Sequence, residues 1–272
     1  MGSLSQTVAE LAHRSNYERR LIIKGVLEDY SLPSMEQRFN HNSNSNVLVN
    51  FSSTKNEAKL LLCAHYDCFP GSPGANDDAS SVSVLLELAR KLKSEGFSWP
   101  LRIAFFDEEE NHLWGSSAYI EEYGINKAAT VLNLELVGRG SVPLFWEKKN
   151  QSDDYLKLLD RTCGELGRRA YFVSQVLGHG GDHQTFYNSG VNNSICLSML
   201  DERDLILVPE AQNIDSNPRS SRRKRASLIR KIRGSYTLKD YHQKTDTADK
   251  ISEESLEFSV NLVYQFVKNY FG

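Results

Sequence analysis

The sequence predicts a single α/β domain in which helices flank a central, mostly parallel or mixed β-sheet. Short apolar runs of strand length alternate with longer segments whose apolar residues recur at helical spacing. This alternation is typical of parallel strands joined by helices, so both faces of the sheet should be covered. The chain has 272 residues, which one large domain can accommodate, and it contains no internal repeat or long linker. We therefore expect one domain over residues 1–272.

The first half of the chain predicts two helices and three strands. Apolar residues at helical spacing predict a helix over residues 5–30, which Pro33 ends. A second helix should begin at Asp77 or Asp78 and run to about Ser94. The strands are expected at residues 47–51, 59–64 and 101–106.

The second half continues the alternation. Helices are expected at residues 114–123, 153–167 and 255–270. Short apolar runs predict strands at residues 130–137, 142–146, 171–173 and 195–200. The sheet should therefore gain strands throughout the chain and be closed by a C-terminal helix.

Composition excludes several classes of protein. The 32 Lys and Arg residues oppose 35 Asp and Glu residues, and this net charge of −3 argues against a protein committed to nucleic acid. No run of about 18 apolar residues predicts a membrane span. The N-terminus shows no secretory signal, so a cytoplasmic location is expected, although a mature secreted chain would look the same. Four cysteines are too sparse for a disulfide framework.

Residues 217–234 form a strongly basic segment that predicts an insertion into the domain. Such a segment could contact an acidic partner, an acidic substrate or a membrane surface. A solvated insertion, partly helical or mobile, fits better because no aromatic residue is interleaved with its cationic residues. Those residues are Arg219, Arg222, Arg223, Lys224, Arg225, Arg230, Lys231 and Arg233.

Three predicted strand ends and one later polar stretch carry side chains suited to metal binding or acid–base chemistry. His65 ends one strand, the acidic quartet 107–110 follows another, and Glu135 follows a third. The polar stretch contains His242. Sites in open α/β sheets form at the carboxyl ends of strands. Acidic residues after strands also favour helix N-termini, but this mixture of His and carboxylates suits zinc, and also manganese or cobalt.

His65 is the clearest candidate metal ligand. Asp67, two residues later, is placed to fix the tautomer of the His65 ring. The Gly- and Pro-rich loop 70–74 then leads to Asp77. Cys68 lies nearby and is read as a reduced thiol rather than a ligand, because hard carboxylates dominate this neighbourhood.

Five motifs in this order resemble the zinc exopeptidases of metallopeptidase family 28, which include bacterial leucyl-type aminopeptidases and, more distantly, glutaminyl cyclases. The motifs are His65-Tyr66-Asp67, Gly74 to Ser81, Glu109 to Ser116, Asn133-Leu134-Glu135, and His242 ahead of Asp246-Thr247. Asp182-His183, Phe186 and Gly190-Val191 resemble a further segment of the family. Each motif alone is weak, but together they cover most of the chain. The resemblance implies the phosphorylase/hydrolase-like fold of zinc exopeptidases.

The resemblance also implies a role for each site residue. His65 and Glu135 would hold one zinc ion, Glu110 and His242 would hold a second, and Asp77 would bridge the two. Glu109 would be the general base, and Asp67 would orient His65. Two further residues are candidate substrate contacts: His183 could bind substrate or only pack the turn at Asp182, and Tyr241 could offer its hydroxyl group or be a half-buried tyrosine. Two Zn²⁺ ions per chain are expected, with Co²⁺ or Mn²⁺ as possible substitutes.

The implied reaction is hydrolysis of the N-terminal peptide bond of a peptide with a free N-terminus. Three positions depart from the family pattern: Glu135 replaces the usual Asp, Ser81 a Gly, and Gly181 a Ser. Carboxypeptidases of a related family use Glu at the first position, so a carboxypeptidase or amidase of the same fold is an alternative. A single-zinc acyltransferase resembling glutaminyl cyclase is a second alternative, and an inactive binding module is a third.

Overall fold

The computed structural model describes residues 2–41, 43–52, 58–124, 129–146, 151–174, 180–216 and 222–272. Its strands are β1 (Ser34–Phe39), β2 (Asn44–Asn50), β3 (Leu60–His65), β4 (Leu101–Phe106), β5 (Thr130–Leu134), β6 (Val142–Trp146), β7 (Tyr171–Val173) and β8 (Asn193–Leu200). They form one sheet in the order β1-β2-β4-β3-β5-β8-β6-β7. The central strands β4, β3, β5 and β8 are parallel, whereas β2 and β6 join them antiparallel. The predicted mixed α/β sheet is confirmed.

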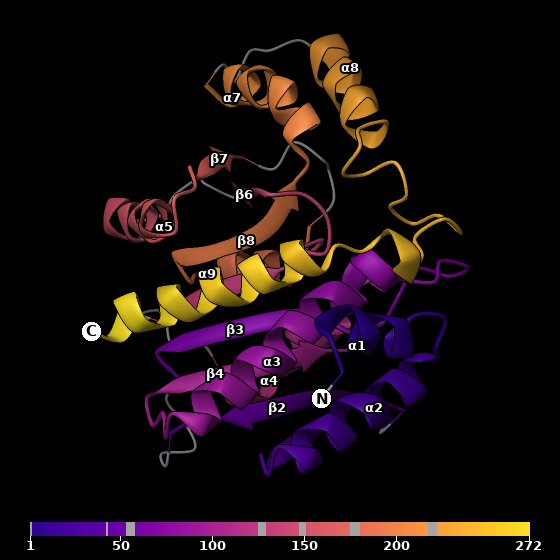
Figure 1. Ribbon diagram of the computed structural model, residues 1–272, viewed down its shortest axis with the longest axis vertical. Helices are drawn as coiled ribbons and strands as arrows, with labels where there is room; N and C mark the ends of the chain where they lie inside the picture. Colours follow the sequence, from indigo (N-terminus) through magenta and orange to yellow (C-terminus); the bar gives the residue numbers. More distant parts are fainter. Residues whose placement is uncertain are drawn as a thin grey trace.

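Helices cover both faces of the sheet (Figure 1). They are α1 (Leu4–Leu11), α2 (Asn16–Asp29), α3 (Ser80–Ser94), α4 (Trp114–Tyr123), α5 (Asp153–Glu165), α6 (Asp182–Asn188), α7 (Val208–Ser216), α8 (Arg222–Arg233) and α9 (Glu253–Phe271). Short helical segments η1 (Ala75–Ala79), η2 (Glu202–Leu207) and η3 (Ala248–Lys250) lie between them. None of the described helices is both long and apolar enough to cross a membrane.

The central strands are apolar throughout because both of their faces are buried. In β3, Leu60 and Leu62 pack into the larger core under α1, α2, α3, α5 and α9. Leu61 and Cys63 point the opposite way, into a smaller core with Tyr119 of α4 and Phe186 of α6. Alternate side chains of a strand face opposite sides, so a strand between two helical layers needs apolar residues at every position.

The N-terminal region differs from the sequence prediction in two ways. The helix predicted over residues 5–30 is two helices, because the chain breaks after Leu11 and Ser15 begins α2 with a capping box to Glu18. Strand β1 was not predicted, because it lies at the edge of the sheet and pairs only with β2. An edge strand has no continuous apolar run to reveal it.

Two predicted boundaries shift in a way that matters for the site. The regular helix α3 begins at Ser80, because Asp77 and Asp78 have non-helical backbone angles. Strand β5 ends at Leu134 rather than Val137, because Leu136 adopts a positive φ of 61° and turns the chain. Asp77 and Glu135 therefore stand in irregular backbone beyond the elements that carry them.

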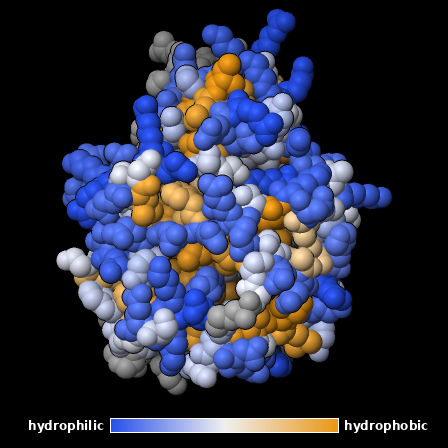
Figure 2. All heavy atoms as spheres, in the orientation of Figure 1, coloured by the Kyte–Doolittle hydropathy of each residue, from blue (hydrophilic) through white to orange (hydrophobic). Residues whose placement is uncertain are grey.

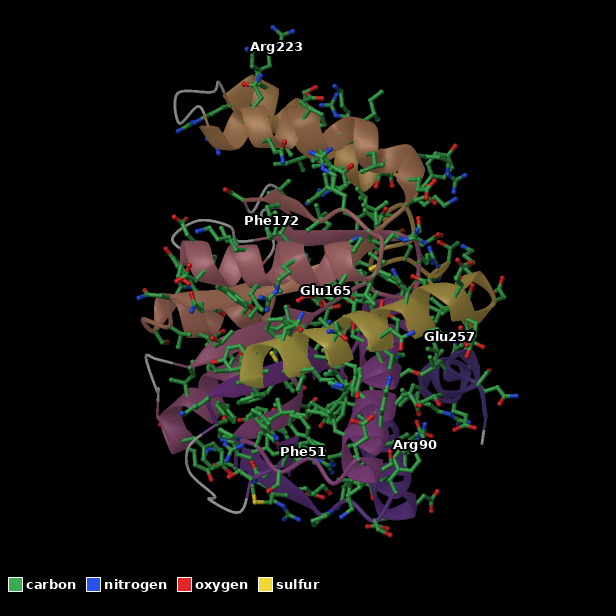
Figure 3. All side chains as sticks on the ribbon, turned by 60° about the vertical axis from the view of Figure 1, so that its left-hand side comes forward. Phe51, Arg90, Glu165, Phe172, Arg223 and Glu257 are labelled. Carbon is green, nitrogen blue, oxygen red and sulfur yellow. The ribbon has the colours of Figure 1, made fainter. Side chains whose placement is uncertain are left out.

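Helices α6, α7 and α8 were not predicted as separate helices. Helix α8 occupies most of the basic segment, whereas residues 217–221 lie outside the described part. Leu228 is its buried anchor, in a third core with β6, β7, β8 and α7. Arg223 points away from the rest of the molecule (Figure 3). Figure 2 shows a narrow hydrophobic strip between α7 and α8 on a largely hydrophilic face.

Candidate active site

The candidate site lies at the carboxyl ends of three neighbouring parallel strands. Strand β3 ends at His65, β4 is followed by residues 107–110, and β5 is followed by Glu135. These strands are adjacent in the sheet, with β3 in the middle. Their ends therefore meet at one edge, where ligands bind in open α/β sheets.

Three residues from distant parts of the sequence converge at this edge. Candidate ligand atoms of Asp77, Glu110 and His242 all lie within 4.8 Å of one another. His242 Nε2 is 3.0 Å from Glu110 Oε2 and 3.3 Å from Asp77 Oδ2. Asp77 precedes α3, Glu110 follows β4, and His242 lies in the loop before α9. The chain therefore brings together the three residues that sequence motifs indicated separately.

His65 lies beside this group and is held from its other side. Its Nε2 is 3.1 Å from Asp77 Oδ1, and its Nδ1 is 3.2 Å from Asp67 Oδ1. The Asp67 carboxylate also accepts hydrogen bonds from the backbone amides of Glu109 and Glu110, both at 3.0 Å. Asp67 thus fixes the ring and the acidic turn relative to each other, as a second layer of a metal site does.

The backbone at Asp77 is also held in place. Asp246 accepts hydrogen bonds from the amides of Asn76 and Asp77, and the peptide bond between Asp77 and Asp78 is cis. The neighbouring Asp78 accepts one hydrogen bond from the Ser81 hydroxyl and one from the Leu136 amide. These contacts connect the Asp77 loop with the end of β5 and with the C-terminal loop.

The donor set fits a zinc ion. It combines two imidazoles with carboxylates, a mixture that zinc commonly accepts. Two buried carboxylate oxygens, Asp77 Oδ2 and Glu110 Oε1, accept no well-aligned hydrogen bond from any described residue, although His242 Nε2 lies 3.3 Å from the first. Buried polar atoms are normally satisfied, and a cation bound among these side chains would satisfy both.

The electrostatics of the site also favour a bound cation. Burial raises the pKa of Glu135 to about 8, and the nearby charge of Asp77 adds to that effect. Burial likewise raises the pKa of Glu109 well above its usual range, and Glu135 and Asp182 reinforce the shift. Without a metal, the positive charge near these carboxyl groups is therefore too small to keep all of them ionised.

The pKa values of the two histidines are also raised, but here nearby carboxylates cause the shift and burial opposes it. Burial lowers the pKa of His242, but its contacts with Asp77 and Glu110 outweigh burial and raise that pKa to about 9. Burial also lowers the pKa of His65, and the charge of Glu109 with the contacts to Asp67 and Asp77 raises it well above the usual range. Each imidazole thus occupies the place of a cation among carboxylates.

Glu135 stands apart from the three-residue group. It is 4% exposed, and Cys196 Sγ lies 3.9 Å from its Oε2. Within the described part of the chain, the group of three potential ligands contains Asp77, Glu110 and His242 but not Glu135. The geometry therefore gathers one three-ligand centre with His65 beside it, and the second ion stays a prediction.

The two predicted substrate contacts have different surroundings. Tyr241 stacks on His242 with ring centroids 3.7 Å apart, at the edge of the site. His183 is fully buried, and burial lowers its pKa to about 3. Its ring packs against Trp146 with centroids 5.7 Å apart. Their roles with substrate stay predictions.

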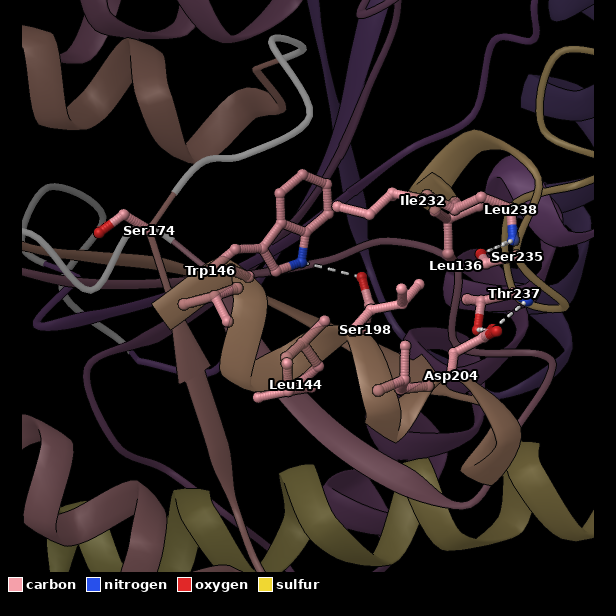
Figure 4. A pocket seen from close by; sticks show the side chains of 15 residues that line it. Leu136, Leu144, Trp146, Ser174, Ser198, Asp204, Ile232, Ser235, Thr237 and Leu238 are labelled. Atoms are coloured by element: carbon pink, nitrogen blue, oxygen red, sulfur yellow. Dashed lines mark hydrogen bonds between the residues drawn. The ribbon is translucent and has the colours of Figure 1, made fainter. Parts of the chain in front are cut away.

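An apolar pocket of about 80 Å³ lies next to the strand end that carries Glu135 (Figure 4). Leu136 forms part of its wall, together with Trp146, Leu200 and Leu238. Ser198 accepts a hydrogen bond from Trp146 Nε1 and donates one to the Glu135 carbonyl oxygen. One hydroxyl group therefore links this pocket to the backbone at Glu135.

Sequence reasoning missed two residues that hold the site together. Asp246 was noted only as part of a motif, yet it binds the amides before and at Asp77. Arg19 was missed because it lies in a helix far from the motifs, and its hydrogen bonds within the described residues go to backbone carbonyls of the site loop. A polar residue on the apolar face of the predicted N-terminal helix was the one available hint.

Comparisons with known proteins place this geometry in a family. The sequence profile of peptidase family M28 matches residues 46–267. Aminopeptidase YwaD of Bacillus subtilis is 36% identical over 150 residues, which cover 50% of this chain and 31% of YwaD. The vacuolar membrane protease of Saccharomyces cerevisiae is 31% identical over 192 residues, 69% of this chain and 20% of that protein. The chain thus spans less than a third of the length of these curated relatives.

Solved structures agree on the fold. The zinc aminopeptidase BSAP from Bacillus subtilis superposes with a TM-score of 0.60 at 26% identity, over 83% of this chain and 50% of that one. The glutaminyl cyclase of Porphyromonas gingivalis superposes with a TM-score of 0.69 at 16% identity, over 98% and 97% of the two chains. The second likeness shows a shared fold alone. From the profile match over most of its length and the convergence of its motif residues, this chain belongs to peptidase family M28.

Proposed function

We propose that this chain is a zinc-dependent aminopeptidase. The observation that supports this most is the convergence of Asp77, Glu110 and His242, with His65 on Asp77 and Glu109 beside them. Asp77, Glu110 and His242 would hold one ion. His65 and Glu135 would hold a second that shares Asp77. Bound zinc would polarise the scissile carbonyl and lower the pKa of a water molecule toward neutrality.

Glu109 is the proposed general base. Burial raises the pKa of Glu109, with Glu135 and Asp182 adding to the shift, so its carboxyl group holds a proton more readily than an exposed glutamate. It would take a proton from the attacking water and deliver it to the leaving amine. Asp67 would keep Glu109 in reach, because its carboxylate binds the Glu109 backbone amide at 3.0 Å.

Recognition of a free N-terminus follows from the surplus of carboxylates. A protonated α-amine would be attracted to the acid-rich edge that contains Glu135 and Glu110. The apolar pocket beside Glu135 would then accept an apolar side chain of the N-terminal residue. We therefore expect leucyl substrates to be cleaved faster than glutamyl or lysyl substrates.

The test is hydrolysis of a panel of aminoacyl-4-nitroanilides by the zinc-loaded protein. We expect cleavage that disappears after chelation, returns with zinc and is abolished by N-acetylation of the substrate. Cleavage of N-acetylated substrates would contradict the aminopeptidase and favour a carboxypeptidase or amidase. Inactivity of the metal-loaded protein on every substrate would favour a binding module.

A glutaminyl cyclase-like acyltransferase is the second candidate. The observation that favours it is the three-residue group, because Asp77, Glu110 and His242 suffice for one ion and Glu135 lies outside that group. The metal content of purified protein separates the two functions. One zinc per chain with release of ammonia from an N-terminal glutaminyl peptide would favour the cyclase, whereas two with hydrolysis would favour the peptidase.

A further inference from the structure

We propose that Arg19 is a positioning residue whose guanidinium group holds together the two ends of the loop between His65 and Asp77, the proposed metal-binding loop. Arg19 belongs to α2 and is fully buried. It lies outside residues 46–267, which match the family profile. The inference rests on the proposed metal site of the aminopeptidase, and it applies to this loop both without and with bound metal.

The guanidinium group connects the two ends of one loop. Its Nη1 donates to the carbonyl oxygens of Tyr66 at 3.2 Å and Asp67 at 3.5 Å. Its Nη2 donates to the carbonyl oxygens of Pro73 at 2.7 Å and Gly74 at 3.1 Å. The loop runs between His65 and Asp77, so one side chain sets the separation of two proposed ligands.

The helix that carries Arg19 is packed into the core. Helix α2 is anchored by Ile23 and Leu27, both fully buried, and begins with a capping box at Ser15. Gly74 has a φ of +64°, and a Cβ atom there would lie 2.6 Å from Arg19 Nη2. Glycine at position 74 thus allows both the backbone turn and the close approach of the guanidinium group.

Burial of the Arg19 cation has an energetic cost that its contacts must offset. Arg19 forms no ion pair with a carboxylate of the described residues, and its Nε has no hydrogen-bond acceptor among them. Burial of a charge is expensive unless other contacts compensate. The four carbonyl contacts compensate here, and only a planar fork reaches both loop ends, because the lysine ammonium is a point charge.

Loss of the clamp should loosen the loop before metal binds. The carbonyl oxygens of four residues would each lose the hydrogen bond that Arg19 donates, namely those of Tyr66, Asp67, Pro73 and Gly74. Metal binding would then have to order His65 relative to Asp77, and the entropic cost of that ordering would weaken the affinity for metal. Metal affinity, rather than folding alone, is the quantity that Arg19 should control.

The test compares Arg19→Met and Arg19→Lys with Leu27→Ala. Leu27 lies in the same helix and is equally buried but points into the core. Zinc affinity is measured by competition with a chromophoric chelator, and stability by urea unfolding of the metal-free proteins. We expect Arg19→Met to bind zinc at least about tenfold more weakly and Arg19→Lys to recover part of the loss. Leu27→Ala should lose stability but keep its affinity.

Hydrogen exchange of the metal-free proteins gives a second readout. Amides of residues 66–74 should exchange faster in Arg19→Met than in Leu27→Ala. Unchanged zinc affinity in Arg19→Met, or an equal loss in Leu27→Ala, would overturn the proposal. If wild-type protein bound zinc but cleaved no substrate, the proposed aminopeptidase would be wrong and the proposed role of Arg19 would be unaffected. If wild type bound no zinc, the metal centre would fail, and exchange in the loop would still decide whether Arg19 clamps it.

Discussion

At the residue scale, Glu108 and Glu109 are neighbours in sequence but have different surroundings. Glu108 accepts hydrogen bonds from Asn44 and Asn111, both at 2.9 Å, and has a φ of 58°. The pKa of Glu109 is instead raised by burial, and the charges of Glu135 and Asp182 add to that shift while His65 opposes it. Glu108 is therefore held by hydrogen bonds to two asparagines, whereas Glu109 is the residue that we propose as the general base.

Glu109→Gln should abolish turnover without loss of fold or metal. The amide keeps the shape of the side chain but cannot accept a proton, so kcat should fall by a factor of about 10² to 10⁴. The measurement is kcat together with zinc content. The matched control is Glu108→Gln, which should keep most activity. If the two variants exchanged these outcomes, the assigned register of the acidic turn would be wrong.

Sequence motifs indicated residues that meet in the candidate site but not the residues that hold those residues in place. His65, Asp77, Glu110 and His242 meet in the candidate site, and they could be found because a metal ligand would need a particular side chain at a particular spacing. Arg19 acts through backbone carbonyl groups, which every sequence possesses. Such a partner can be found only when the loop and the helix are placed in space.

At the element scale, most strands could be predicted because burial on both faces requires a continuous apolar run. Strands β4, β6 and β7 occupy the predicted ranges, and so does helix α4. Edge strand β1 and the separation of α1 from α2 could not be predicted in this way. The first pairs on one side only, and the second depends on a short turn through His13, whose φ is 62°.

Helix α4 offers a test of how closely an element must approach the site. A Cβ atom at Gly115 would lie 2.2 Å from the Asp107 carbonyl oxygen and 2.6 Å from Asn46 Oδ1. Gly115→Ala should therefore push α4 away from the end of β4 and destabilise the protein by about 2–3 kcal/mol. Urea unfolding with a linear extrapolation measures this loss.

The control for this prediction is Gly25→Ala. Gly25 lies inside helix α2, and a Cβ atom there would meet nothing within 4 Å. Alanine is the better helix former, so this variant should gain roughly 0.5–1 kcal/mol. Equal stability of Gly115→Ala and wild type would show that α4 can shift without cost.

At the scale of the whole molecule, the fold buries several carboxyl groups close together, and a bound cation would balance their charge. The chain has a net charge of only −3, yet it buries the carboxyl groups of Asp77, Asp78, Asp107 and Glu135 near the ends of its parallel strands. Burial is the main cause that raises the pKa of four buried carboxyl groups. Those pKa values are about 8 for Glu135, about 7 for Asp182, and about 6 for Asp107 and Asp246.

These shifts predict how the stability of the metal-free protein depends on pH. A carboxyl group whose pKa is raised by folding stabilises the protein fully below its ordinary pKa, and that stability is lost as pH rises through the folded value. His242, whose pKa is raised to about 9, acts in the same direction above about pH 6.5. His183, whose pKa is lowered to about 3 by burial, affects stability only below its ordinary pKa of about 6.5. The metal-free protein should therefore lose stability steadily between about pH 6.5 and 9.

Zinc should reverse this trend, because its ligands must be deprotonated and binding releases their protons. The free energy of unfolding should be measured for chelator-treated and zinc-loaded protein at several pH values across this window. We expect the difference between them to grow with pH, by up to about 1.4 kcal/mol per pH unit for each proton released. Glu135→Gln should flatten the metal-free curve, because it removes the carboxyl group with the highest numerical pKa of the four. A metal-free protein that became more stable across this window would show that these acids are not held protonated by the fold, and that the site is not built around a missing positive charge.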